Sequence, residues 1–213
     1  MNIVYIDDSP DLFISRYMSE MSIKSQSVSG AEKLEYDEII FDDDKNFEDL
    51  LKNKKVIEAN ILIVDERLFE EQSERKKFTG LQFRLILKKV YPFKEVIVIT
   101  QPNYLDTQNR DDIVYKYSGK DGREAATKHY ENCLKPAIVK ATNNYNESAN
   151  LIHQLIDSYR QTGDEVPAIF EKMSNSLFDN DYSYQDFRKS DIDKLIKSFN
   201  CLERTIHEGL QNK

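Results

Sequence analysis

The sequence predicts an open α/β sheet of five parallel strands with helices on both faces, followed by an all-α C-terminal region. Three segments, residues 3–6, 61–64 and 96–99, are almost unbroken runs of aliphatic and β-branched residues. Such runs are typical of parallel strands covered by helices on both faces, where polar–apolar alternation is lost. Helical patterns separate them, and this strand–helix order favours right-handed crossovers within one sheet.

The first two thirds of the chain contain the whole predicted sheet. The expected strands are residues 2–6, 36–41, 61–64, 96–100 and 112–117. The expected helices between them are residues 10–18, 46–54 and 81–90. Ser9 and Pro10 suit the cap and first position of the first of these helices. Residues 101–110 are polar and predict a loop where a further helix would be expected.

Beyond residue 117 the pattern is purely helical. Apolar residues recur at helical spacing in four segments: residues 122–141, 147–161, 167–178 and a final one that begins near residue 190. We expect Pro136 to kink or break the first of these. We therefore predict two units, an α/β domain of residues 1–141 and a helical module of residues 142–213.

Composition excludes several classes of protein. No apolar stretch is long enough for a transmembrane helix. The N-terminus enters a strand-like run with no basic segment before it, which argues against a signal peptide and favours the cytoplasm. The net charge is −8, and from residue 141 onward 8 Lys and Arg residues face 12 Asp and Glu residues. Nucleic acid is therefore an unfavourable partner, and protein binding or self-association suits the helical module better.

Polar residues follow the predicted strands at the places where a ligand would bind. Asp7 and Asp8 follow the first strand, Asp65 the third and Thr100 the fourth, while Lys116 belongs to the fifth. Open α/β sheets bind ligands at the carboxyl ends of their strands. Three carboxylates there would repel one another without a cation, and oxygen-only ligands suit Mg²⁺. A hydroxyl and an ammonium group could then hold phosphate oxygens.

This ordered set of residues resembles the receiver domain of bacterial two-component response regulators, which has a flavodoxin-like fold. The resemblance covers residues 1–140, and Gly80 matches the glycine that opens the helix after the family's phosphoacceptor strand. It implies that Asp65 accepts a phosphoryl group from a histidine kinase or a phosphotransfer protein. It also implies that Asp8, Asp65 and the carbonyl of Arg67 bind Mg²⁺.

The resemblance assigns the remaining roles as well. Asp7 would orient the water shell of the metal, Thr100 would hydrogen-bond the phosphoryl group, and a strand-five lysine would pair with it. Lys116 is our choice for this lysine, although it lies closer to Thr100 than is usual. Lys120 has the usual separation but falls beyond the strand, and the Lys-Pro pair at Lys135 sits in a helical pattern.

Residues 66–78 depart from the family. The family has a short loop with a proline here, whereas this segment is longer, highly charged and free of proline. Its basic residues could gate the pocket or bind a partner, or the segment could be a solvated surface helix.

The sequence thus predicts a phosphoryl-accepting signalling protein that relays its state through C-terminal helices. Its chemistry would be limited to self-catalysed phosphoryl transfer and autodephosphorylation. The alternative is a phosphate-independent adaptor with a receiver-like fold that only binds other proteins. A Mg²⁺-dependent phosphohydrolase with Asp7 as nucleophile is a third hypothesis, but the expected Asp-x-Asp pair is absent, since Asp8 and Ser9 follow Asp7.

Overall fold

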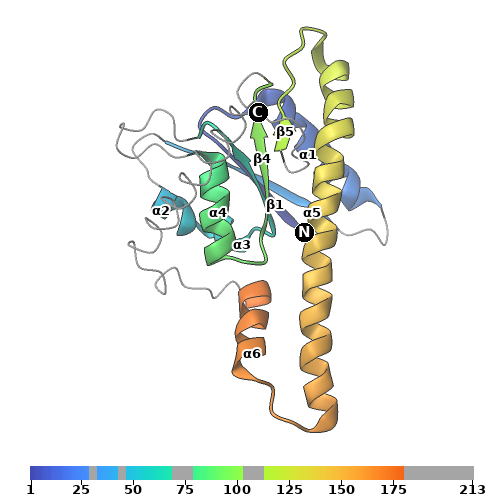
Figure 1. The fold of residues 1–213 in the computed structure, drawn as a ribbon. Coiled ribbons are helices and arrows are strands. Elements are labelled where there is room, and N and C mark those ends of the chain that lie inside the picture. The colour runs from blue at the N-terminus through green and yellow to red at the C-terminus, as the bar shows by residue number, and fades with distance from the viewer. Residues whose placement is uncertain (29–32, 43–46, 69–78, 103–112, 180–213) are drawn as a thin grey trace, which may run out of the picture.

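The computed structural model contains the predicted parallel sheet, with the strand order β2-β1-β3-β4-β5 (Figure 1). The structure describes residues 1–28, 33–42, 47–68, 79–102 and 113–179. The five strands are β1 Asn2–Asp7, β2 Glu35–Ile40, β3 Ile61–Asp65, β4 Glu95–Thr100 and β5 Ile113–Tyr115. Every neighbouring pair is parallel. The predicted fold class is therefore confirmed, because this is the flavodoxin-like order.

Helices cover both faces of the sheet. On one face α1 (Leu12–Ser27) and α5 (Gly122–Thr162) pack over alternate strand residues such as Ile3 and Tyr5. The opposite face is covered by α2 (Phe47–Leu51), α3 (Lys54–Glu58) and α4 (Gly80–Val90). Their core includes the intervening strand residues Val4 and Ile6, as the two-residue period of a strand requires.

Two predicted helices differ from the observed ones in extent. The helix expected at residues 10–18 is capped by Asp11 rather than Ser9, because the Asp11 carboxylate accepts hydrogen bonds from the backbone N–H groups of Phe13 and Ile14. It also continues to Ser27. The helix expected at residues 46–54 is α2, which ends at Leu51; a second short helix, α3, follows at Lys54–Glu58 and is capped by Asn53.

The helix after β3 begins as the sequence indicates. Thr79 and Gln82 form a reciprocal capping box around the first turn of α4. The charged segment predicted at residues 66–78 is described only as far as Leu68. There Glu66 and Leu68 are buried and Arg67 is exposed. The basic residues Arg75, Lys76 and Lys77 lie outside the described residues.

The largest correction concerns α5, which is one continuous helix of 41 residues. The predicted break at Pro136 is wrong, and the helix also crosses the predicted boundary between residues 141 and 142. Proline removes the hydrogen bond to the carbonyl four residues earlier, that of Asn132. Both Pro136 and Asn132 are exposed, so water can reach this carbonyl, while Leu134 and Ile138 pack beneath on the sheet.

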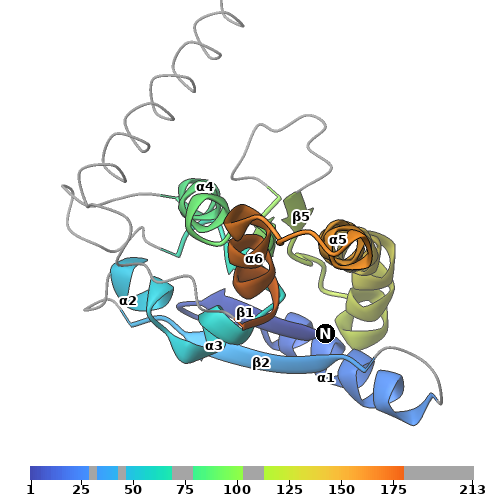
Figure 2. The same ribbon diagram turned by 90° about the horizontal axis from the view of Figure 1, so that it is seen from below.

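The second half of α5 extends beyond the sheet and pairs with α6 (Ala168–Ser174) and the π-helical segment η1 (Asn175–Asp179) (Figures 1 and 2). Ile152, Ile156 and Leu177 form a separate small core there. Phe93, from the turn before β4, packs against it. The apolar pattern predicted from residue 190 onward lies outside the described residues. No helix among the described residues combines the length and apolar character that crossing a membrane requires.

Candidate functional site

Three of the predicted site residues project from the same face of the sheet. Asp7 follows Ile3 and Tyr5 at two-residue intervals, and Asp65 follows Ile61 and Ile63, all of them on the face covered by α1 and α5. Lys116 follows Val114 of the same face by one such interval. Chain order reverses between β1 and β3, so the three side chains meet at the topological switch point.

A polar cavity of about 280 Å³ opens at this edge of the sheet. It contains all of the predicted metal-binding residues and the predicted lysine. Its lining is Asp7, Asp8, Ser9, Asp11, Asp65, Arg67, Gln101 and Lys116.

Lys116 bridges the two buried carboxylates of the cavity. Its Nζ lies 2.8 Å from Oδ2 of Asp7 and 2.6 Å from Oδ1 of Asp65. The side chain of Lys116 is 12% exposed, that of Asp7 1% and that of Asp65 6%, so water screens these ion pairs little. Burial alone would lower the pKa of Lys116, but Asp65 and Asp7 outweigh it and raise that pKa above its ordinary value. Lys116 is therefore cationic.

Asp7 is held by two further groups. The Tyr5 hydroxyl donates a hydrogen bond to Oδ2, and the backbone N–H of Ser9 donates to Oδ1 at 3.0 Å. Burial, followed by the charge of Asp7, raises the pKa of Tyr5, which keeps the hydroxyl protonated as a donor. Sequence reasoning missed Tyr5, because its place in an apolar run fits a core residue. The two-residue interval between Tyr5 and Asp7 was the signal that could have revealed it.

Asp65 combines a lysine contact with a backbone contact. Its Oδ2 accepts a hydrogen bond of 2.8 Å from the N–H of Arg67, while Oδ1 faces Lys116. Burial raises the pKa of Asp65 more than the charge of Lys116 lowers it, and the charge of Asp7 adds to the rise. The two buried carboxylates thus share one ammonium group, and a second cation would favour their ionised forms.

Asp8 lies at the open side of the cavity and is exposed. Partial burial, followed by a hydrogen bond and charge repulsion from Asp7, raises the pKa of Asp8 to about 6. Its carboxylate therefore adds negative charge to a cavity that already holds an incompletely neutralised pair.

Thr100 does not join this group. It lies at the end of β4 on the same strand face as Val96 and Val98, which is opposite to the face of Asp65 by strand alternation. It is fully buried and is not among the described residues that line the cavity. Within the described structure its hydroxyl has no hydrogen-bond partner. The neighbouring residue Gln101 takes part in the lining instead.

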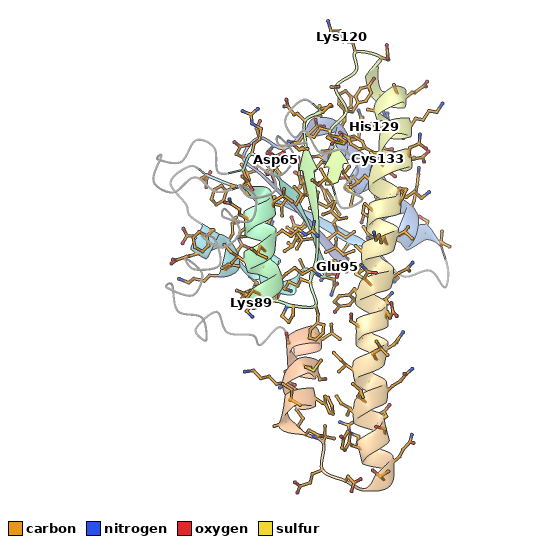
Figure 3. All side chains as sticks on the ribbon, viewed as in Figure 1. Asp65, Lys89, Glu95, Lys120, His129 and Cys133 are labelled. Carbon is orange, nitrogen blue, oxygen red and sulfur yellow. The ribbon has the colours of Figure 1, made fainter. Side chains whose placement is uncertain are left out.

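The alternative lysines lie elsewhere. Lys120 is exposed beyond the end of β5, far from Asp65 (Figure 3). Lys135 is exposed on α5. Of the lysines that the sequence analysis weighed, Lys116 is the one in the cavity.

The residues of the cavity fit a hard divalent cation by their chemistry. The side chains of Asp7, Asp8 and Asp65 offer only oxygen atoms as ligands. Asp11 brings the carboxyl groups of the lining to four, beside the cationic residues Lys116 and Arg67. The described residues contain no group of three or more His, Cys, Asp or Glu side chains arranged at metal-binding distances.

Comparison with known proteins adds no family to this description. Neither the protein-family models nor the curated proteins include a match to the chain.

Proposed function

We propose that this protein is a response-regulator-like signalling protein that accepts a phosphoryl group on Asp65 with the help of Mg²⁺. The observation that carries the proposal is the bridge that Lys116 makes between Asp7 and Asp65 at the switch point of the sheet. A buried carboxylate paired with a lysine, beside further carboxylates in an open cavity, suits phosphoryl transfer.

In the proposed reaction, an oxygen of Asp65 attacks the phosphorus atom of a phosphohistidine. The donor is a histidine kinase or a phosphotransfer protein. The new bond joins phosphorus to the Asp65 oxygen, and the bond from phosphorus to the donor nitrogen breaks, which leaves its electron pair on the imidazole. Lys116 favours the ionised form of Asp65 before the reaction and would pair with phosphoryl oxygens afterwards.

Asp8, Asp65 and the backbone carbonyl of Arg67 would hold Mg²⁺, and Asp7 would orient its water ligands. When bound, the metal would supply positive charge against the negative charge of the phosphoryl group. The unpaired hydroxyl of Thr100 supports a role as a later donor, because a buried hydroxyl without a partner is costly and gains from a new acceptor. It would have to turn from its present face of the sheet.

The output would be a change in protein contacts made by the helical part of the chain, either with a second copy or with another protein. The second half of α5 carries exposed apolar residues, Leu151 and Leu155, beside its own small core. Phosphorylation would change the charge at Asp65 and with it the position of Lys116, which lies between β5 and α5 in the chain.

One observation favours the phosphate-independent adaptor as a second candidate. Both oxygens of Asp7 and both oxygens of Asp65 already have partners in the described structure: Lys116, Tyr5 and the N–H groups of Ser9 and Arg67. Such a satisfied network can be a purely structural feature.

A mass measurement separates the two candidates. The intact protein is incubated with a small phosphodonor, with and without Mg²⁺, alongside an Asp65→Asn variant of nearly the same shape. We expect the mass of one phosphoryl group to be added to the wild-type chain but not to Asp65→Asn, and only with Mg²⁺. Glu58→Gln, an exposed carboxylate remote from the cavity, is the matched control and should label normally. Equal labelling of Asp65→Asn would place the acceptor elsewhere, and no labelling of the wild type would favour the adaptor.

A further inference from the structure

The backbone that carries Lys116 is held on both sides by two consecutive residues of α5. On one side, Nε2 of His129 lies 2.7 Å from the carbonyl oxygen of Tyr115. On the other, the N–H of Tyr117 donates a hydrogen bond of 3.0 Å to the hydroxyl of Tyr130. A carbonyl can only accept, so this contact requires the proton of His129 to be on Nε2.

Strand β5 needs this support. It has three residues and lies at the edge of the sheet, where it pairs with β4 alone. The backbone N–H of Lys116 donates a hydrogen bond of 2.7 Å to the carbonyl of Thr100 in β4. A strand at the edge of a sheet has backbone groups that no neighbouring strand pairs with. The two contacts from α5 provide hydrogen bonds to this backbone on both sides of Lys116.

Aromatic packing fixes the two α5 residues in turn. The Tyr130 side chain is fully buried, and its ring meets that of His129 edge-on at 5.2 Å between centroids. Tyr117 lies 5.8 Å from the His129 ring and 5.8 Å from the ring of Phe13 in α1. Tyr17 of α1 lies 5.8 Å from Tyr130. These five residues join α1, α5 and the end of β5 in one cluster, and such ring pairs favour defined geometries.

We propose that His129 and Tyr130 are positioning residues that hold the Lys116 ammonium group between Asp7 and Asp65 and couple this site to α5. The coupling part rests on the proposed function. His129 lies near the same end of the molecule as Asp65 (Figure 3), and α5 runs from there without interruption to Thr162. A shift of the Lys116 backbone therefore acts on the helix that forms the C-terminal core with α6 and η1.

The test uses the full chain and single substitutions that remove one bond each. Tyr130→Phe removes only the hydroxyl, and His129→Leu removes the donor to Tyr115. His129→Gln keeps an N–H donor and should rescue most of the His129→Leu defect. Tyr91→Phe is the matched control, because the buried Tyr91 hydroxyl makes a similar bond of 2.9 Å to the Leu51 carbonyl on the other face of the sheet.

The first measurement is the NMR signal of the Lys116 ammonium group, assigned by its loss in Lys116→Met and recorded without phosphodonor or metal. We expect a slowly exchanging signal in the wild type and in Tyr91→Phe, and a shifted, faster-exchanging one in Tyr130→Phe and His129→Leu. An unchanged signal in both of these variants would overturn the inference, whatever the labelling experiment gives.

The second measurement is the labelling rate with a small phosphodonor and Mg²⁺. Displacement of a reacting group by a fraction of an ångström should lower the rate about tenfold in Tyr130→Phe. Hydrogen exchange of the backbone in residues 142–162 should respond to the phosphodonor in the wild type but not in this variant. If the wild type is not labelled, the proposed function and the coupling fail, whereas the ammonium signal still decides the positioning role. Normal labelling together with a normal exchange response in Tyr130→Phe would refute the coupling.

Discussion

Gly80 and Asp65 are in direct backbone contact: a Cβ atom at Gly80 would lie 2.5 Å from the carbonyl oxygen of Asp65. It would also lie 2.9 Å from the Cα atom of Glu66. Backbone atoms cannot turn aside as a flexible side chain can, so only glycine lets the start of α4 approach the end of β3 this closely. The glycine thereby sets how closely α4 packs against the end of β3, the strand that carries Asp65.

Gly80→Ala should accordingly destabilise the protein, although alanine is the better helix former. We expect a loss of about 1–3 kcal/mol in the free energy of unfolding, the usual range for overpacking. Urea denaturation measures it, with Lys89→Ala on the exposed side of α4 as the control. A Gly80→Ala protein as stable as the wild type would show that α4 can move away from β3.

Lys116→Met should destabilise the protein strongly, because it leaves two buried carboxylates without their cation. Removing one partner of a buried ion pair costs on the order of 3 kcal/mol. Burial already raises the pKa of Asp65, and loss of Lys116 removes the charge that lowers it, so the deficit should shrink as the pH falls from 7 to 5. Adding Asp65→Asn should recover part of the loss. Urea titrations at both pH values measure the effect, and a deficit that grows on acidification would contradict this account.

Much of this site was predictable because it depends on strand ends and a two-residue period. Asp7, Asp65 and Lys116 each follow an apolar residue of the same sheet face by two positions, and parallel strands bring their carboxyl ends to one edge. The position of Thr100 was not predictable in this way. Thr100 lies at the end of its strand as expected. The register of β4 against β3 pairs Asp65 with Ile99, so the next residue, Thr100, points to the opposite face of the sheet.

The continuity of α5 through Pro136 could not be predicted for a different reason. Proline in a helical pattern normally predicts a break, and the cost depends on whether the freed carbonyl can reach water. At Pro136 it can, since the proline and Asn132 share the exposed side of the helix. The positioning role of His129 and Tyr130 could not be predicted either. It depends on their hydrogen bonds to the backbone of Tyr115 and Tyr117, and no sequence pattern indicates such contacts.

Asp8→Ala should stabilise the metal-free protein slightly and weaken Mg²⁺ binding. The pKa of Asp8 is raised to about 6, so its ionised form costs stability above that pH, and the cost disappears as the pH falls below the ordinary value near 4. The variant should thus gain less than about 1 kcal/mol at pH 7.5, because the side chain is exposed and screened, and nothing at pH 4. Thermal melts at both pH values and Mg²⁺ titration calorimetry measure the two effects. A loss of stability at pH 7.5 would make Asp8 a structural residue.

Lys94 provides a prediction at alkaline pH. Its buried ammonium group donates hydrogen bonds to the carbonyl oxygens of Ile57 and Ala59, at the C-terminal end of α3. Burial lowers the pKa of Lys94 to about 8. The unfolded chain therefore binds more protons than the folded one between pH 8 and the ordinary lysine pKa near 10.5, so the stability contributed by this residue rises with pH.

We expect the stability of the wild type relative to Lys94→Met to increase by about 2 kcal/mol between pH 8 and pH 10. Comparing the two chains at each pH cancels the contributions of the tyrosines, which titrate in both. Guanidinium denaturation at the two pH values measures the difference. A constant difference would mean that Lys94 keeps an ordinary pKa in the folded protein.

A chain that ends at Ala141 should fold on its own, although the cut divides α5. The half of α5 before the cut contributes Tyr130, Leu134 and Ile138 to the core on the sheet, whereas Ile152 and Ile156 after it belong to the separate small core with α6 and η1. Truncation would uncover Phe93, which packs against that small core, and little else of the sheet domain. We expect a cooperative thermal transition and retention of the slowly exchanging Lys116 signal. Phe93→Ser in the truncated chain should improve solubility without lowering the transition temperature. A truncated chain that melts without cooperativity would show that residues 1–141 and the C-terminal helices form one folding unit, which would refute the predicted domain boundary.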